Sequence, residues 1–266
     1  MSAPTPLLDF FKRGEVARDV RLQAAQATLA PRAHEQLAIL VLLLDDPDAE
    51  IRRAADATIN RIPVEALKAF LARSDVPTGV RELFAGRGVL PAEVAAIESD
   101  DPLIDMSGDT AAAEAEEEDA AMLPEGADRE SVTQLLAKMS FPDRLKAALK
   151  GTREMRAILV RDPNKMIAGA VLSSPKLTEA EVEGIAKMAS VAEEVLRTIG
   201  SNRAWMKSYK IVLGLAKNPK TPVAMSLNLM SRLQDRDIAK LAVDRNIPEP
   251  LRVAARKRMA AATSKQ

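Results

Sequence analysis

Apolar side chains recur three and four positions apart along most of the chain. The clearest stretches are residues 20–29, 35–44, 51–62, 64–71 and 135–149, which are also rich in Ala, Leu, Arg and Glu. This spacing places apolar side chains on one face of a helix, and these residue types favour helices. The sequence lacks alternating runs of apolar β-branched and polar residues, and it lacks Asn-Gly and Asp-Gly hairpin turns. The pattern therefore predicts an all-α protein.

Prolines divide this helical pattern into short pieces. Proline favours the first turn of a helix and disrupts its interior, so each of these prolines is predicted to mark a helix start. The prolines are Pro47, Pro63, Pro77, Pro91, Pro142, Pro163, Pro175, Pro219 and Pro248. Many helices of roughly 10 residues with short connections are typical of a helical-repeat array.

The C-terminal part repeats with a period of 28 residues, anchored at Pro163, Val191, Pro219 and Ile247. Positions six before, four after, eight after and fourteen after each anchor are all apolar. In that order they are Ala157, Ile185, Leu213, Leu241; Ile167, Val195, Val223, Leu251; Val171, Ile199, Leu227, Ala255; and Leu177, Trp205, Leu233, Ala261. Because 28 residues are four heptads, one long amphipathic helix would keep a similar register, but the prolines and glycines exclude it.

Asp or Asn precedes proline at two of these anchors, in Asp162-Pro163 and Asn218-Pro219. These short polar side chains are suited to cap the helix that follows. The N-terminal part carries the pattern once clearly, at Asp46-Pro47, with Ile51 four residues later.

Three segments resemble bacterial HEAT-like repeats, and especially the leucine-rich-repeat-variant type. They are residues 159–182 (LVRDPNKMIAGAVLSSPKLTEAEV), 215–223 (LAKNPKTPV) and, closer to an ordinary HEAT unit, 42–55 (LLLDDPDAEIRRAA). The resemblance covers most of residues 15–97 and 131–260. It implies an α-solenoid of short helix pairs whose curved face binds macromolecules, without fixing the ligand. Some leucine-rich-variant proteins are linked to a Cys-bound iron–sulfur cluster, which this chain cannot hold because it has no Cys.

The formal net charge of zero conceals three segments of very different charge. Residues 1–97 carry 12 basic and 13 acidic side chains, residues 98–130 carry 1 and 13, and residues 131–266 carry 25 and 12. The middle segment has no aromatic residue and too little apolar surface to offset the entropy of ordering. We therefore expect an N-terminal HEAT-like domain (1–97), an acidic disordered linker (98–130) and a basic helical-repeat domain (131–266).

Composition excludes several classes of function. With no Cys and one His among 266 residues, the chain lacks disulfides, thiolate metal sites and multi-His metal sites, and no metal or cofactor is expected. No run reaches the roughly 18 apolar residues of a membrane span, and the N-terminus lacks a basic and apolar leader. We expect a cytoplasmic protein with no membrane partner.

Three local motifs have ordinary structural explanations. Four carboxylates in residues 45–50 lack the 12-residue spread and the glycine of an EF-hand loop, so they are predicted to cap a helix. His34 has no accompanying ligand or nucleophile motif and is predicted to be a surface or partly buried histidine. Gly86-Arg87-Gly88 is predicted to be a turn between helices rather than a phosphate loop.

Residues 201–210 contain the single Trp and the single Tyr of the chain. Trp205 falls in an apolar repeat column and is predicted to lie in the core. Tyr209 is compatible either with the core or with an aromatic platform beside cations. The candidate partner-binding residues are Arg203, Lys207, Tyr209, Lys210, Lys217, Lys220, Arg252 and Arg256, because stacked repeats can align cations into a stripe.

The sequence therefore predicts a non-enzymatic scaffold that docks a protein partner, expected to be acidic, on its basic C-terminal repeats. The alternative is DNA or RNA binding through the same surface. The acidic linker is hypothesised to compete with the partner for the basic surface. No chemistry-bearing motif supports an enzyme.

Overall fold

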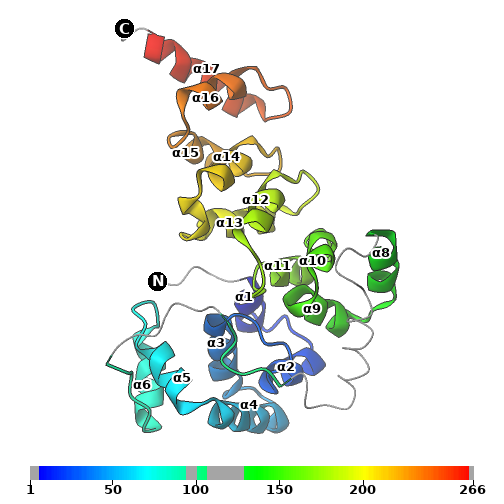
Figure 1. Ribbon diagram of the computed structural model, residues 1–266, viewed down its shortest axis with the longest axis vertical. Coiled ribbons are helices and arrows are strands. Elements are labelled where there is room, and N and C mark those ends of the chain that lie inside the picture. The colour runs from blue at the N-terminus through cyan, green and yellow to red at the C-terminus, as the bar shows by residue number, and fades with distance from the viewer. Residues whose placement is uncertain (1–5, 94–100, 107–128, 264–266) are drawn as a thin grey trace.

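The computed structural model describes residues 6–93, 101–106 and 129–263, and in these residues it contains helices and no strand (Figure 1). The N-terminal part contains α1 (Pro6–Lys12), α2 (Arg18–Ala25), α3 (Ala33–Leu43), α4 (Ala49–Arg61), α5 (Val64–Leu71) and α6 (Thr78–Gly86). The C-terminal part contains α8 (Arg129–Lys138), α9 (Phe141–Lys150), α10 (Arg153–Leu159), α11 (Lys165–Val171), α12 (Glu179–Lys187), α13 (Glu193–Ser201), the 3-10 turn η2 (Trp205–Lys207), α14 (Tyr209–Lys217), α15 (Val223–Met230), α16 (Asp235–Val243) and α17 (Glu249–Thr263). The all-α prediction is confirmed for these residues.

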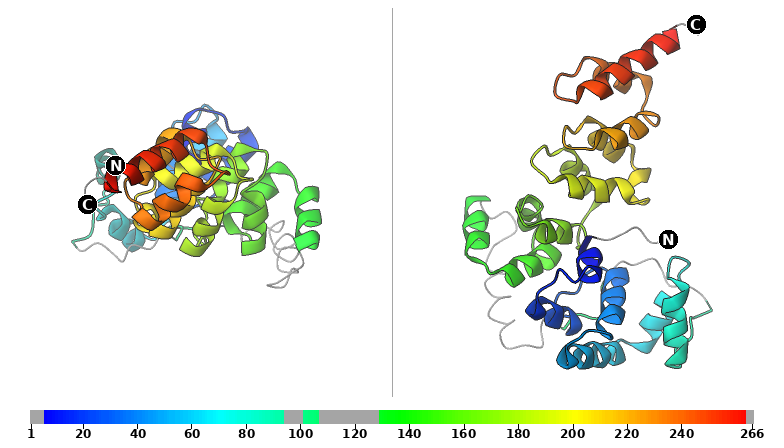
Figure 2. Two further views of the ribbon diagram at one scale, coloured as in Figure 1. Left: turned by 90° about the horizontal axis from the view of Figure 1, so that it is seen from above. Right: turned by 180° about the vertical axis from the view of Figure 1, so that it is seen from behind.

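Successive C-terminal helices form pairs that stack along the long axis of the molecule (Figures 1 and 2). Within the pairs, α10 contacts α11, α12 contacts α13, α14 contacts α15, and α16 contacts α17. Between the pairs, α12 contacts α14 in one row, and α11 contacts α13 and α15 contacts α17 in the other. The arrangement is solenoid-like, because each pair buries its apolar faces against its neighbours.

The sequence spacing of these helices is close to the predicted period. The second helices of the four pairs begin at residues 165, 193, 223 and 249, which are 28, 30 and 26 residues apart. Ten of the sixteen predicted column residues are buried.

The register differs in the third repeat. Pro222 is the N-cap residue of α15, so the helix begins four residues after its anchor, whereas α11 and α13 begin two residues after theirs. Two residues rotate a helix face by about 200°. The interior positions are consequently Ser226, Leu229 and Met230, and the column residues Val223 and Leu227 are only partly buried. A strict 28-residue column is therefore wrong here.

The prediction that each proline opens a helix is also wrong at Pro47, Pro163, Pro175 and Pro219, which lie in connections two or more residues before the next helix. Asp46 and Asp162 accept hydrogen bonds from the backbone N–H two residues on, at 2.9 and 2.8 Å, and form turns that contain the proline. The helices begin after the next residue, Asp48 or Asn164, whose side chain is the true N-cap. Pro142, by contrast, lies in the first turn of α9 as predicted.

Buried polar groups link consecutive pairs. Arg156 of α10 donates to Glu181 Oε1 of α12 from Nε at 3.0 Å and from Nη2 at 2.8 Å. The buried Asn218, which follows α14, donates to the carbonyls of Ala186 and Met188 at the end of α12, at 2.8 and 2.9 Å. Such groups are costly to bury unless they are hydrogen-bonded, so they fix how adjacent pairs are placed.

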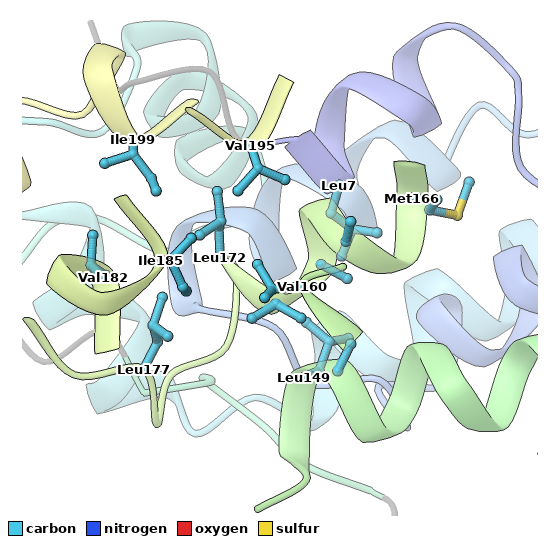
Figure 3. Close-up of a cluster of buried hydrophobic side chains, with 14 of the residues drawn as sticks. Leu7, Leu149, Val160, Met166, Leu172, Leu177, Val182, Ile185, Val195 and Ile199 are labelled. Atoms are coloured by element: carbon cyan, nitrogen blue, oxygen red, sulfur yellow. The ribbon is translucent and has the colours of Figure 1, made fainter. Parts of the chain in front are cut away.

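The N-terminal helices pack directly on the first C-terminal pair. Helix α1 lies against α3 and α11, and Leu7 of α1 points toward α11, which carries Met166, in the shared core (Figure 3). The backbone N–H of Arg32 donates to the Ser173 carbonyl at 3.2 Å, and Ser173 Oγ donates to Glu35 Oε1 at 2.8 Å. The two parts therefore share one continuous apolar core.

Part of the predicted disordered linker is ordered. Within residues 98–130, the structure describes residues 101–106, which lie on the N-terminal helices, and residues 129–130, which open α8. Leu103 and Ile104 pack against the core. The prediction of disorder across the whole segment is wrong for these residues, because Leu103 and Ile104 bury apolar surface against the core. The remainder lies outside the described residues.

Candidate interaction surface

Tyr209 ties the start of α14 to the start of α16. Its hydroxyl donates to Asp237 Oδ2 at 2.6 Å and accepts from the backbone N–H of Gln234 at 3.2 Å. Burial raises the pKa of Tyr209, and the hydrogen bond to Asp237 raises it further, so the phenol stays protonated. The hydrogen bonds of the Tyr209 hydroxyl therefore link the start of α14 to the start of α16.

Two cations lie against Asp237, whose side chain is 5% exposed. Lys240 Nζ lies 3.6 Å from Oδ1, and Arg236 Nε lies 3.7 Å from Oδ2. The hydrogen bond from Tyr209 lowers the pKa of Asp237, and the charges of Lys240, Arg236 and Lys217 lower it further. The buried carboxylate thus pairs with Arg236 and Lys240, and the charge of Lys217 also favours its ionised form.

A second carboxylate performs the same task between α12 and α14. Glu183 Oε1 accepts a hydrogen bond from Lys187 Nζ at 2.5 Å, and Glu183 Oε2 lies 3.8 Å from Lys210 Nζ. The hydrogen bond from Lys187 lowers the pKa of Glu183, and both lysine charges add to this effect. Tyr209 contacts Asp237 and the adjacent Lys210 contacts Glu183, so the clusters around these two carboxylates lie next to each other. Together they include residues of α12, α14 and α16.

We name this surface the cationic face. Its members are Lys187, Lys210, Lys217, Arg236 and Lys240, with Glu183 and Asp237 between them. Sequence reasoning predicted two of the five cations, Lys210 and Lys217. The other three, Lys187, Arg236 and Lys240, do not cluster along the chain with these two and come near them only when the helices pack.

The missed signal was the position of each cation within its helix. Lys187 and Lys217 are the last residues of α12 and α14, and Lys210 and Arg236 are the second residues of α14 and α16. Equal positions on packed, parallel-stacked helices come to lie side by side.

Three other predicted cations lie in connections between helices. Arg203 precedes η2, Lys207 ends it, and Lys220 follows α14. All three are exposed, and within the described part of the chain none of them shares a carboxylate with the cationic face.

Arg252 and Arg256 hold α17 against α16. Arg256 Nε donates to the Ala242 carbonyl at 3.0 Å, and Arg252 Nη1 lies 3.5 Å from the Asp244 carbonyl. Arg252 also pairs with Glu249. Carbonyls at a helix C-terminus lack intrahelical donors, so these arginines cap α16.

The structure agrees with the structural explanations of two local motifs. Asp48 caps α4 by accepting from the Glu50 N–H at 2.8 Å, as the carboxylate-rich motif predicted. Gly88 has a φ of +80° in the turn after α6, a backbone conformation that favours glycine. Trp205 is half-buried against the core.

His34 belongs to a polar cluster between α3 and the α5–α6 connection. Its Nε2 lies 2.7 Å from Asp75 Oδ2, and its ring meets the Phe70 ring edge-on at 4.9 Å. Arg73 donates to both oxygens of Asp75, at 3.1 and 3.0 Å. Burial alone would raise the pKa of Asp75, but the hydrogen bonds from Arg73 and His34 lower the pKa to about 2.

A shallow groove of about 390 Å³ lies between α1, α9 and the start of α11. Phe10, Phe141 and Met166 line it, together with Lys165 and Glu15.

Among residues 6–93, 101–106 and 129–263, no three His, Cys, Asp or Glu side chains lie close enough to hold a metal ion. None of the described helices is both long and apolar enough to span a membrane.

A scan against protein-family models, a search of curated proteins and a search of solved structures each found no match to this chain. The geometry defines its class as an all-α helical stack with local pair packing.

Replacing Asp75 with Asn is expected to lower the free energy of unfolding near neutral pH by about 1 kcal/mol, since the carboxylate is partly exposed and ion pairs of this kind contribute little more. The folded-state pKa of about 2 lies below the ordinary value of 3.8, so the contribution is present above about pH 4 and is lost as the pH falls toward 2. Urea unfolding at about pH 6 and pH 3 measures the difference between wild type and variant.

The matched control is Asp235→Asn, because Asp235 is exposed and has no ion pair in the described residues. A wild-type advantage over Asp75→Asn that grows as the pH falls would contradict the assignment of these hydrogen bonds.

Proposed function

We propose that this chain is a non-enzymatic α-solenoid scaffold of the HEAT-like, leucine-rich-variant kind, which binds an acidic segment of a partner protein on its cationic face. The observation that carries the proposal is the grouping of five cations of α12, α14 and α16 around Glu183 and Asp237. A surface on which cations outnumber carboxylates attracts anionic partners and speeds their association.

The cations of this face are available to a partner. The side chains of Lys210, Arg236 and Lys240 are between 66 and 75% exposed, and their carboxylate contacts are 3.6–3.8 Å long. Exposed pairs at such distances contribute little to stability. A carboxylate of the partner can therefore pair with these cations without breaking a strong interaction within the protein.

Two features favour a protein partner over a nucleic acid. Glu183 and Asp237 interrupt the run of cations, and they would repel a continuous phosphate backbone. Tyr209 and Trp205 are both partly buried against the core, so each offers less ring surface for base stacking than an exposed aromatic side chain would. A protein segment with separated carboxylates fits this pattern better.

We further propose that the acidic residues between α6 and α8 compete with the partner for the cationic face. This part of the proposal rests on the sequence charge of residues 98–130, most of which lie outside the described residues. A tethered acidic segment has a high effective concentration near the face and would suppress weak partners.

The triple variant Lys187→Ala/Lys210→Ala/Lys240→Ala is expected to weaken binding of labelled poly-L-glutamate by about tenfold or more, because each lost charge contributes roughly 0.5–1 kcal/mol. Fluorescence anisotropy at about 0.15 M salt measures the affinity.

The control Lys12→Ala/Arg53→Ala/Lys138→Ala removes three exposed cations from α1, α4 and α8 and should change the affinity less than twofold. Equal effects of the two triples would contradict the assigned face. Tighter binding of a single-stranded oligonucleotide than of poly-L-glutamate would favour the nucleic-acid alternative.

The variant Glu116→Gln/Glu117→Gln/Glu118→Gln should bind the same probe about two- to fivefold more tightly, since it weakens the competing segment. A matched variant, Glu15→Gln/Glu65→Gln/Glu93→Gln, makes the same charge change on exposed N-terminal positions. If both variants shift the affinity equally, only overall charge matters and the competition does not occur.

A further inference from the structure

Residues 101–106 lie on the N-terminal helices without forming a helix, and one buried side chain, Gln36, binds their backbone. Gln36, which is 2% exposed, donates from Nε2 to the Ile104 carbonyl at 2.5 Å and accepts on Oε1 from the Ile104 N–H at 3.1 Å. Its amide thus makes both hydrogen bonds that a neighbouring β-strand would offer. A side-chain amide used in this way binds a peptide through its backbone N–H and carbonyl. It therefore tolerates many side chains at that position.

The loop between α2 and α3 supplies a second backbone contact. The Met106 N–H donates to the Ala27 carbonyl at 3.2 Å. Ala27 and Ala30 have φ values of +57° and +41°, which are unusual for residues with a Cβ. A left-handed residue of this kind costs about 1 kcal/mol or more, and such strain concentrates at binding sites.

Side chains add specificity at three successive positions. Leu103 and Ile104 pack against the core, and Asp105 Oδ1 accepts from Lys150 Nζ at 2.5 Å. Lys150 is the last residue of α9, so the segment contacts both the N-terminal and the C-terminal parts of the molecule. The chemistry recognised is two adjacent apolar side chains followed by a carboxylate.

We propose that Gln36, Ala27 and Lys150 form a peptide-binding site, that residues 101–106 are its intramolecular ligand, and that the site accepts an extended segment of another protein with the same apolar–apolar–acidic chemistry. This site is separate from the cationic face, which lies on α12, α14 and α16. Four of the contacts go to backbone atoms or to one carboxylate, and any extended peptide with that pattern presents them. The bound segment is joined to the chain on both sides, so its effective concentration is high and a free peptide competes poorly until the segment is released.

The test uses the full chain and a labelled peptide of residues 99–108, SDDPLIDMSG. The released variant Leu103→Asp/Ile104→Asp removes the apolar contacts of the internal segment and should bind this peptide at least tenfold more tightly than wild type does. A second, milder variant, Asp105→Lys, breaks the pair with Lys150 but keeps Leu103 and Ile104, and it should bind about two- to fivefold more tightly than wild type. A scrambled peptide is the ligand control.

Adding Gln36→Met to the released variant should weaken peptide binding at least tenfold, since Met fills a similar volume without an amide. Circular dichroism checks that each variant keeps its helices. The proposal is overturned if neither the released variant nor Asp105→Lys binds the peptide better than wild type, if Gln36→Met has no effect on binding, or if the scrambled peptide binds equally well. Loss of the helices in the released variant would also overturn it, because residues 101–106 would then be an integral part of the fold.

Discussion

The first turn of α3 is the joint on which the rest of the structure depends. Over five consecutive residues, 32–36, it contacts three separate parts of the chain: Ser173 in the C-terminal repeats, Asp75 beside α5 and Ile104 in the segment before α8. Glu35, Gln36 and Ser173 are each no more than 2% exposed. Polar groups buried this deeply must keep their partners, so these contacts set the orientation of every neighbouring part.

This joint also explains how one molecule carries two different surfaces. The stack of α12, α14 and α16 extends away from the joint (Figure 1), and the cationic face lies on these helices. The site of residues 101–106 lies at the joint itself, where α3 and α9 meet the same segment. The first surface suits long-range attraction of an acidic partner. The second suits short-range recognition of a peptide backbone.

Local rules of the sequence predicted the helices well and predicted the contacts between them less well. Helical spacing, proline positions and the approximate 28-residue period each depend on neighbouring residues. The third repeat deviates because Pro222 shifts the start of α15, which a fixed period cannot anticipate. Lys187 and Arg236 share their positions in α12 and α16 with Lys217 and Lys210 of α14, whereas Lys240 lies one turn after Asp237 in α16. The bond between Glu35 and Ser173 links residues 138 positions apart and has no local signal.

A double-mutant cycle between Glu35→Ala and Ser173→Ala tests most directly whether the α3 joint holds the two parts together. Urea unfolding of wild type, both single variants and the double variant measures the coupling free energy. A direct buried hydrogen bond predicts a coupling of roughly 1–3 kcal/mol, with the double variant little less stable than the worse single variant. Additive losses with no coupling would show that the two parts do not depend on this bond, and would contradict the account.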